Sequence, residues 1–269
     1  MQIRRSKVIG FCAGVRRAVT MAEANPNSFV VGGDIVHNPF EVSRLEKNYN
    51  IVGAPDIADV NDTAIIRAHG VAESVISELN NRDVKIIDAT CVNVKRVQQI
   101  AKEFSKNGYH LFILGDAAHP ETIGIVGHTN GNVTVLSKAA ELENIELPSK
   151  RALISQTTKS ESEFKAAEKI LRPAEVVNTI CPAMKTNLDA AIELAHASDI
   201  MIIIGGKKSS NTRVLSETVR AYCTDCHSIE SADDILPEWF IGKSNCGIAA
   251  GLSTPDYLID AVEERLKTL

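Results

Sequence analysis

The sequence is poor in aromatic residues, has no excess of positive charge and contains no long apolar run. Aromatic side chains make up 4% of its 269 residues and the formal net charge is −5, so a surface that binds nucleic acid is not expected. No apolar stretch approaches the roughly 18 residues typical of a membrane span, and residues 1–14 lack the apolar core of a secretory signal. We therefore expect a soluble, cytoplasmic protein.

A disulfide framework is not expected either, because the chain shows no secretory signal. The sequence nevertheless contains six cysteines: Cys12, Cys91, Cys181, Cys223, Cys226 and Cys246. A cysteine considered alone is usually a small buried apolar side chain, but for the set, metal binding or redox chemistry is the better interpretation. Cys223 and Cys226 form a CxxC pair that has no second pair, and we interpret it as structural or incidental.

Short β-branched segments alternate with helical patterns along the whole chain. Residues 110–116 (HLFILGD) and 200–206 (IMIIIGG) are examples of the first kind, and residues 92–106 are an example of the second. This alternation is typical of α/β proteins with mainly parallel sheets. Because the strands are continuous apolar runs, we expect helices on both faces of each sheet.

A weak internal repeat divides the chain into three similar parts. In each part an apolar strand (residues 7–11, 84–90 and 174–180) leads to a cysteine and then to an amphipathic helix. The cysteines Cys12, Cys91 and Cys181 lie 79 and 90 residues apart, and each interval fits one small α/β unit. We predict units at 13–91, 92–180 and 181–269, and we expect the N-terminal strand, within residues 1–12, to join the third unit.

Each of these three cysteines is expected at the carboxyl end of a strand, where open α/β sheets bind their ligands. Each also begins a helix, whose partial positive charge favours a thiolate. Three such thiolates could converge at a pseudo-threefold centre. Structural zinc usually takes four ligands in closely spaced pairs, whereas three separate thiolates suit an iron–sulfur cluster with one open iron.

Hydrogen-bond donors recur at five further junctions between a strand and a helix. Donors beside free helix N–H groups favour an anion, and several such junctions favour a phosphate or diphosphate. Helix capping is the alternative for the serines and the asparagine, and it is the simpler interpretation of Ser210 or Ser253 taken alone. The residues are His37, His69, His119, Ser209, Ser210, Asn211 and Ser253.

Glu121 and Thr157 are two more candidates. Glu121 follows His119 by two residues, and a carboxyl group there could relay protons. From spacing alone, a first-turn glutamate favoured by the helix dipole is the simpler interpretation. Thr157 follows another strand and could supply a hydroxyl group.

Taken in order, these segments resemble the LytB/IspH family of 4-hydroxy-3-methylbut-2-enyl diphosphate reductases. The resemblance runs from about residue 10 to residue 256, and its ordered set of motifs is specific although no single motif decides it. The motifs are GFCAGVRRAV, VHNP, RAHGV, DATCVNVKRVQ, HPETIGIVGHT, SQTT, GGKKSSNTRVL and AGLSTPD.

The resemblance implies three similar α/β units around a central four-iron, four-sulfur cluster with one open iron, held by Cys12, Cys91 and Cys181. It implies that Glu121 delivers protons and that Thr157 positions the substrate hydroxyl, a role for which the adjacent Thr158 stays an alternative. The remaining implied substrate-binding residues are His37, His69, His119, Ser209, Ser210, Asn211 and Ser253.

The implied reaction is the last step of the non-mevalonate (MEP) isoprenoid pathway. It is the reductive dehydroxylation of 4-hydroxy-3-methylbut-2-enyl diphosphate to isopentenyl and dimethylallyl diphosphate, with electrons from a ferredoxin or flavodoxin. The segment CPAMKTN after Cys181 departs from the more polar turn of many relatives, but it retains the cysteine.

Two other functions are compatible with the residues alone. The first is a metal-dependent phosphohydrolase with His37, His69, His119 and Glu121 as ligands. The second is a non-catalytic sensor that binds a diphosphate and uses the cluster to detect redox state. Metal content distinguishes the first from the reductase, and turnover with a chemical reductant distinguishes the second.

Overall fold

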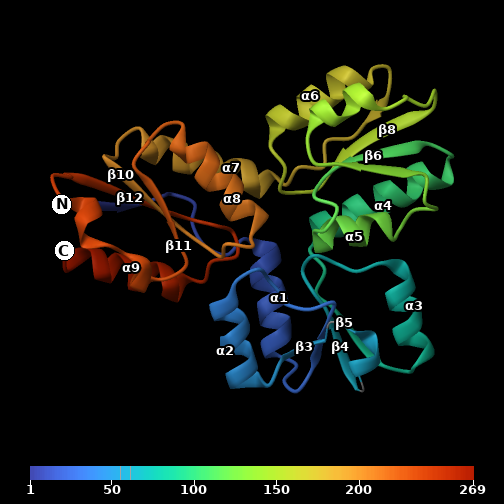
Figure 1. Ribbon diagram of the computed structural model, residues 1–269. Coiled ribbons are helices and arrows are strands. Elements are labelled where there is room, and N and C mark those ends of the chain that lie inside the picture. The colour runs from blue at the N-terminus through green and yellow to red at the C-terminus, as the bar shows by residue number, and fades with distance from the viewer. Residues whose placement is uncertain (55, 61) are drawn as a thin grey trace. The chain divides into compact units, whose positions relative to one another are not determined.

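The computed structural model describes residues 1–54, 56–60 and 62–269. Within these ranges the strands form three four-stranded sheets, and every strand pair is parallel (Figure 1). The three sheets are β3-β2-β4-β5, β7-β6-β8-β9 and β11-β10-β12-β1. The order is the same in all three sheets when β1 is counted as the fourth strand of the third. The predicted α/β class with three similar parallel units is therefore confirmed.

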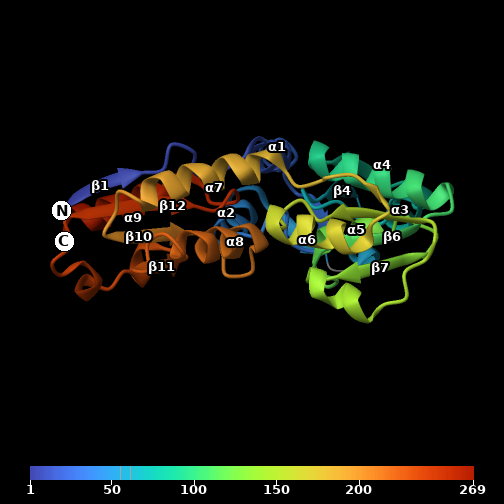
Figure 2. The ribbon, with the colours of Figure 1, turned by 90° about the horizontal axis from the view of Figure 1, so that it is seen from above.

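The strands of the first sheet are β2 (Phe29–Val31), β3 (Val52–Ala54), β4 (Thr63–Ile66) and β5 (Lys85–Asp88). Those of the second are β6 (His110–Leu114), β7 (Val133–Leu136), β8 (Arg151–Ser155) and β9 (Glu175–Val176). Those of the third are β1 (Gln2–Arg5), β10 (Ile200–Ile204), β11 (Cys226–Ile229) and β12 (Asn245–Ala250). Figure 2 shows the third sheet with its strands in the order β1, β12, β10, β11.

Helices connect the strands as the alternating sequence pattern predicts. They are α1 (Ala13–Glu23), α2 (Pro39–Tyr49), α3 (Glu73–Asn81), α4 (Val92–Lys106), α5 (Pro120–Val126), α6 (Glu161–Leu171), α7 (Pro182–Ala195), α8 (Ser210–Arg220) and α9 (Asp256–Lys267). Among the described residues, none of these helices combines the length and the apolar character needed to cross a bilayer.

Both faces of the second and third sheets are buried. In β10 the side chains of Ile200, Ile202 and Ile204 belong to one apolar cluster, while those of Met201 and Ile203 belong to another. In the second sheet, α6 covers one face, and α4 and α5 cover the other (Figure 1). These two-sided cores explain why the strands are continuous apolar runs.

The described chain packs as two compact units. One contains residues 1–15, 37–41 and 182–269, and therefore the third sheet. The other contains residues 16–36 and 42–181, and therefore the first two sheets. The boundaries 13–91, 92–180 and 181–269 stay a prediction.

The strand expected at residues 7–11 is wrong. β1 ends at Arg5, and Ser6 makes a last bond from its N–H to the carbonyl of Ile248, at 2.8 Å. Gly10 then adopts a φ of +81°, which no extended strand allows. A Cβ there would lie 2.9 Å from Oδ1 of Asp256, so the close packing of the turn requires glycine. Cys12 follows this turn rather than a strand end.

Candidate active site

One backbone hydrogen bond recurs at all three predicted cysteine ligands. In each case the cysteine N–H donates to the carbonyl of the second residue beyond the third strand of the same sheet. The pairs are Cys12 with Leu252 (3.1 Å), Cys91 with Ala68 (3.0 Å) and Cys181 with Thr157 (2.9 Å). A helix begins at the next residue in every case, namely α1, α4 and α7. The internal repeat seen in the sequence is thus a repeat of one local structure.

The thiols of these three turns differ from the other cysteines in their surroundings. Each lies at an intermediate depth, whereas Cys223, Cys226 and Cys246 are buried. Burial raises the pKa of Cys226 to about 11 and that of Cys246 to about 12, so these two stay protonated at neutral pH. Cys223 and Cys226 both pack in an apolar cluster of the third sheet, which agrees with a structural CxxC pair.

Asn93 is a residue that the sequence analysis did not identify. Its Nδ2 lies 3.2 Å from the Sγ of Cys181, although it stands two residues after Cys91. The two cysteine turns of this compact unit therefore lie side by side, and an amide donor reaches one of the sulfurs. The Cys181 sulfur thus has a hydrogen-bond donor from the neighbouring cysteine turn.

His69 and His119 are brought together in the same unit. Their ring centroids are 5.5 Å apart and the rings are nearly perpendicular, at 80°. His119 caps α5, and its Nδ1 accepts the N–H of Glu121 at 3.1 Å. Because Nδ1 is an acceptor, the proton of the neutral ring lies on Nε2. His119 can therefore donate a hydrogen bond to a ligand from Nε2.

Glu121 is 2% exposed and is held by Thr157 at both of its carboxylate oxygens. The backbone N–H of Thr157 donates to Oε1 at 2.7 Å, and the Thr157 hydroxyl donates to Oε2 at 2.8 Å. Burial raises the pKa of Glu121 to about 7, although the two hydrogen bonds oppose the shift. A carboxyl group with this pKa can both hold and release a proton near neutral pH.

Gln156 is a second residue that sequence reasoning missed. It precedes Thr157, its Oε1 accepts the N–H of Asp116 at 3.0 Å, and its Nε2 donates to the hydroxyl of Thr158 at 3.0 Å. Thr158 is therefore bonded to Gln156, whereas Thr157 is bonded to Glu121. A polar residue directly before the two threonines in SQTT is the only signal that the sequence offered.

The other compact unit contains the remaining candidates. Ser209, rather than Ser210, caps α8, with its hydroxyl accepting the N–H of Thr212 at 3.3 Å. Asn211 is buried, and neither its Oδ1 nor its Nδ2 has a hydrogen-bond partner among the described residues. A buried amide without a partner is costly, so the start of α8 is suited to a polar ligand.

His37 and Ser253 lie together in this unit. The Ser253 hydroxyl donates to the carbonyl of His37 at 3.4 Å. A Cβ on Gly206 would lie 2.7 Å from the same carbonyl oxygen, so the His37 segment also packs against the loop before α8. The structure therefore gathers the predicted His37, Ser253 and α8 residues within one unit.

Nearly the whole chain matches one protein family. The family model described as LytB protein matches residues 3–267. The chain belongs to the LytB protein family. The family resemblance inferred from the sequence is confirmed.

Relatives of this LytB family member are similar over their whole length. The chain is 43% identical to the 4-hydroxy-3-methylbut-2-enyl diphosphate reductase of Campylobacter concisus, covering 99% of both chains. It is 40% identical to the protein of the same name from Helicobacter pylori, covering 100% of both.

Two solved structures are also similar to the LytB family member. One is described as (E)-4-hydroxy-3-methyl-but-2-enyl diphosphate reductase, the terminal enzyme of the non-mevalonate pathway. It matches with a TM-score of 0.73 and 34% identity over 99% of both chains. The Plasmodium falciparum reductase matches with a TM-score of 0.91 and 22% identity, covering 99% of this chain and 87% of the other. The second likeness shows the fold alone.

Glu121 should make the stability of the protein fall as the pH rises. The carboxyl titrates near 4.5 in an exposed setting and near 7 in the folded protein, so between these values the folded state binds the additional proton. Glu121→Gln removes this titration. In urea unfolding, the free energy of unfolding of the variant should rise relative to that of the wild type by up to about 3 kcal/mol between low pH and pH above 7. The free energy of unfolding of the variant should therefore depend less on pH. Glu161→Gln, at the exposed start of α6, is the control, and an unchanged slope for Glu121→Gln contradicts the raised pKa.

Proposed function

We propose that this LytB family member reduces 4-hydroxy-3-methylbut-2-enyl diphosphate to isopentenyl and dimethylallyl diphosphate. This is the last step of the non-mevalonate pathway. Relatives of this name that match over the full length support the proposal. The structural observation that carries it is the position of Thr157. Its carbonyl accepts the N–H of Cys181, while its own N–H and hydroxyl donate to Glu121. One residue thus joins a predicted cluster ligand to the predicted proton donor.

The three cysteine turns fit an iron–sulfur cluster as its ligands. Their thiols lie at intermediate depth, they start helices, and Asn93 donates to one of the sulfurs. The pKa values of Cys226 and Cys246, raised by burial, disfavour the thiolate that a metal requires. Cys12, Cys91 and Cys181 would hold a four-iron, four-sulfur cluster, which would supply electrons and a Lewis-acidic iron for the substrate hydroxyl.

Side chains of the protein would deliver the protons that the reaction consumes. Cleaving the C–O bond and releasing water consumes two electrons and two protons. In its protonated form, Glu121 is positioned to pass one proton through the Thr157 hydroxyl to the departing oxygen. We assign the orientation of the substrate to His119, which caps α5, and to its neighbour His69. Because Thr157 occupies both Glu121 oxygens, a phosphohydrolase that uses Glu121 as a metal ligand is disfavoured.

The diphosphate is assigned to the unit that contains α8. Ser209, Ser210, Asn211, Ser253 and His37 would contact its oxygens, at the positively polarised N-terminal end of α8. The unpartnered amide of Asn211 supports this assignment, because a ligand oxygen would satisfy its Nδ2. We further propose a cytoplasmic location and a ferredoxin or flavodoxin as electron donor.

Turnover tests the function directly. Anaerobically purified protein should convert 4-hydroxy-3-methylbut-2-enyl diphosphate to both products when a chemical reductant and a redox mediator are supplied. Binding of the substrate without product would instead indicate a sensor. Release of phosphate without a reductant would indicate a phosphohydrolase.

Substitution of the three proposed ligands should remove the cluster, because each supplies a thiolate that alanine lacks. Cys12→Ala, Cys91→Ala and Cys181→Ala should each lose the visible sulfur-to-iron absorption of anaerobic protein together with turnover. Cys223→Ala is the matched control and should retain both. An equal loss in the control, or a full cluster in any of the three variants, contradicts the assignment.

Asn211→Ala should raise KM without removing the cluster. A hydrogen bond to a charged group contributes about 1.5–3 kcal/mol, so KM should rise by about tenfold or more. The control is Ser216→Ala on the same helix, since the Ser216 hydroxyl already has a partner in Ser228 at 2.7 Å. Steady-state kinetics with the chemical reductant make the comparison, and an unchanged KM for Asn211→Ala removes its assigned role.

A further inference from the structure

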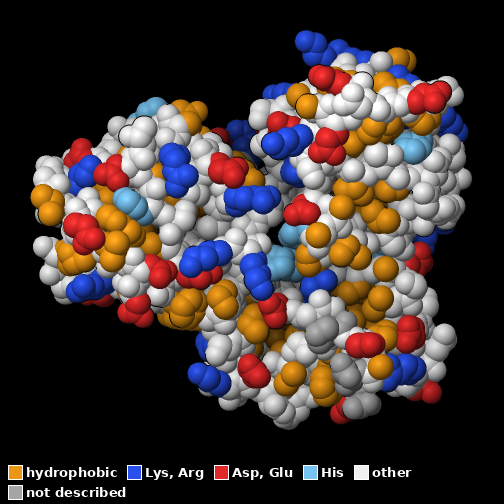
Figure 3. Space-filling model, viewed as in Figure 1, with side chains coloured by type: hydrophobic (Ala, Val, Ile, Leu, Met, Phe, Trp, Pro, Cys, Tyr) orange, Lys and Arg blue, Asp and Glu red, His pale blue; other side chains and the backbone are white. Residues whose placement is uncertain are grey.

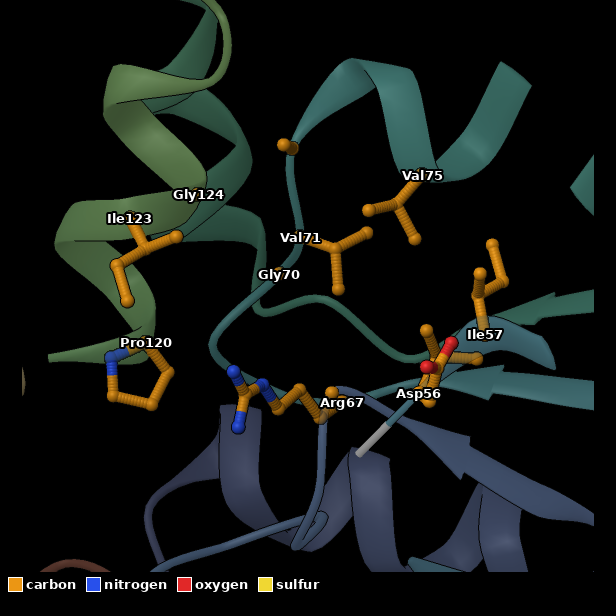
Figure 4. Close-up of a pocket in the computed structure, with 12 residues that line it drawn as sticks. Asp56, Ile57, Arg67, Gly70, Val71, Val75, Pro120, Ile123 and Gly124 are labelled. Carbon is orange, nitrogen blue, oxygen red and sulfur yellow. The ribbon is translucent and has the colours of Figure 1, made fainter. Parts of the chain in front are cut away.

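A cavity lies in the unit that contains the first two sheets, and none of the proposed site residues lines it. Its volume is about 640 Å³, within the usual range of small-molecule sites. Figure 4 shows Pro120 and Ile123 of α5 on one side, with Val71 and Val75 facing them. Ile123 is 53% exposed, so an apolar wall meets solvent here.

Arg67 is the only cation among the described residues that line this cavity. Its Nε is buried without a hydrogen-bond partner, and its guanidinium forms no ion pair with any described residue. Burial lowers the pKa of Arg67, and the attraction of the exposed Asp34 opposes the shift. An arginine remains cationic under such conditions. A partly buried cation that makes no direct ion pair is costly, and an anion in the cavity would offset this cost.

The backbone makes room for this guanidinium. Gly32 has a φ of +81°, and a Cβ on it would lie 3.1 Å from Nη2 of Arg67. Gly33, with a φ of +106°, also lacks a side chain beside Nη1. The two equivalent positions in the other sheets, directly after the third strand, are Gln156 and Gly251. The Oε1 of Gln156 accepts the N–H of Asp116 in a neighbouring turn, whereas the Nε of Arg67 has no hydrogen-bond partner among the described residues.

We propose that this cavity binds a small amphipathic anion, a phosphate or carboxylate on a short hydrocarbon body. The anionic head pairs with Arg67, whose planar donors match both groups. The body lies along Val71, Val75 and Ile123. Asp56 lies at the side of the cavity opposite Pro120 (Figure 4), and its carboxylate keeps the head at the Arg67 end. No residue assigned to the reductase reaction lines this site, although Gly70 and Pro120 are chain neighbours of His69 and His119.

Methyl NMR of anaerobically purified protein tests the site without relying on activity. Pentyl phosphate and hexanoate are titrated separately, and the tighter of the two identifies the head group. Saturable shifts are expected at the methyl groups of Ile123, Val71 and Val75. Inorganic phosphate and pentanol should bind at least about tenfold more weakly, because each lacks half of the recognised structure. Shifts that are absent, or equally strong with pentanol, overturn the proposal.

Matched variants assign the head group to Arg67. Arg67→Met keeps the apolar stem and should weaken binding about tenfold or more, while Arg96→Met, at an exposed position of α4, should leave it unchanged. Arg67→Lys serves if Arg67→Met disturbs the spectrum, and it should retain weakened binding. Equal affinity in wild type and a folded Arg67→Met contradicts the proposal.

One further variant separates this site from the diphosphate site. Asn211→Ala should leave the methyl shifts and the affinity of pentyl phosphate in the cavity unchanged. If Asn211→Ala abolishes them, the probe binds at the diphosphate site and the cavity proposal is wrong. The reductase proposal is tested separately, by turnover of the wild-type protein, and this test does not depend on the cavity.

Discussion

The hydrogen bond from each cysteine N–H to the carbonyl beyond the third strand is the constraint on which the site depends. It fixes the cysteine at the end of the sheet, and a helix starts at the next residue. The three hydrogen bonds have nearly the same length. Because the carbonyl belongs to the segment that carries Thr157 in the second sheet, the same bond positions the partner of Glu121. The proposed cluster ligand Cys181 and the proposed proton donor Glu121 therefore depend on one structural element. A change in the loop after β8 would disturb both.

Burial sets the chemistry of this element. Glu121 lies in an enclosed setting in which the neutral form is favoured, and two hydrogen bonds from Thr157 partly restore the charged form. The balance leaves the pKa near neutrality, which neither effect alone would give. Burial acts in the same direction on Cys226 and Cys246, and it raises the pKa of each thiol so far that both stay protonated at neutral pH. The fold thus separates cysteines suited to ligation from cysteines suited to packing.

Much of this arrangement could be predicted from the sequence, because it depends on local patterns. The apolar runs gave the parallel sheets, and the repeated order of strand, cysteine and helix indicated three similar units. Some side-chain surroundings could not be predicted, namely those of Asn93, Gln156 and Arg67. Each side chain lies beside residues that are distant in the sequence, and no local pattern gives its direction. The choice between Thr157 and Thr158 for positioning the substrate hydroxyl was open for the same reason. The prediction of a strand at residues 7–11 was wrong, because the turn around Gly10 also contains hydrophobic residues such as Ile9, which packs against the core.

The central claim is that three equivalent turns hold one iron–sulfur cluster for a reduction. Iron and acid-labile sulfide per chain, measured on anaerobically purified protein, test it most directly. The account predicts about four of each per chain. Zinc or manganese without sulfide, or protein that contains neither iron nor sulfide, would contradict it.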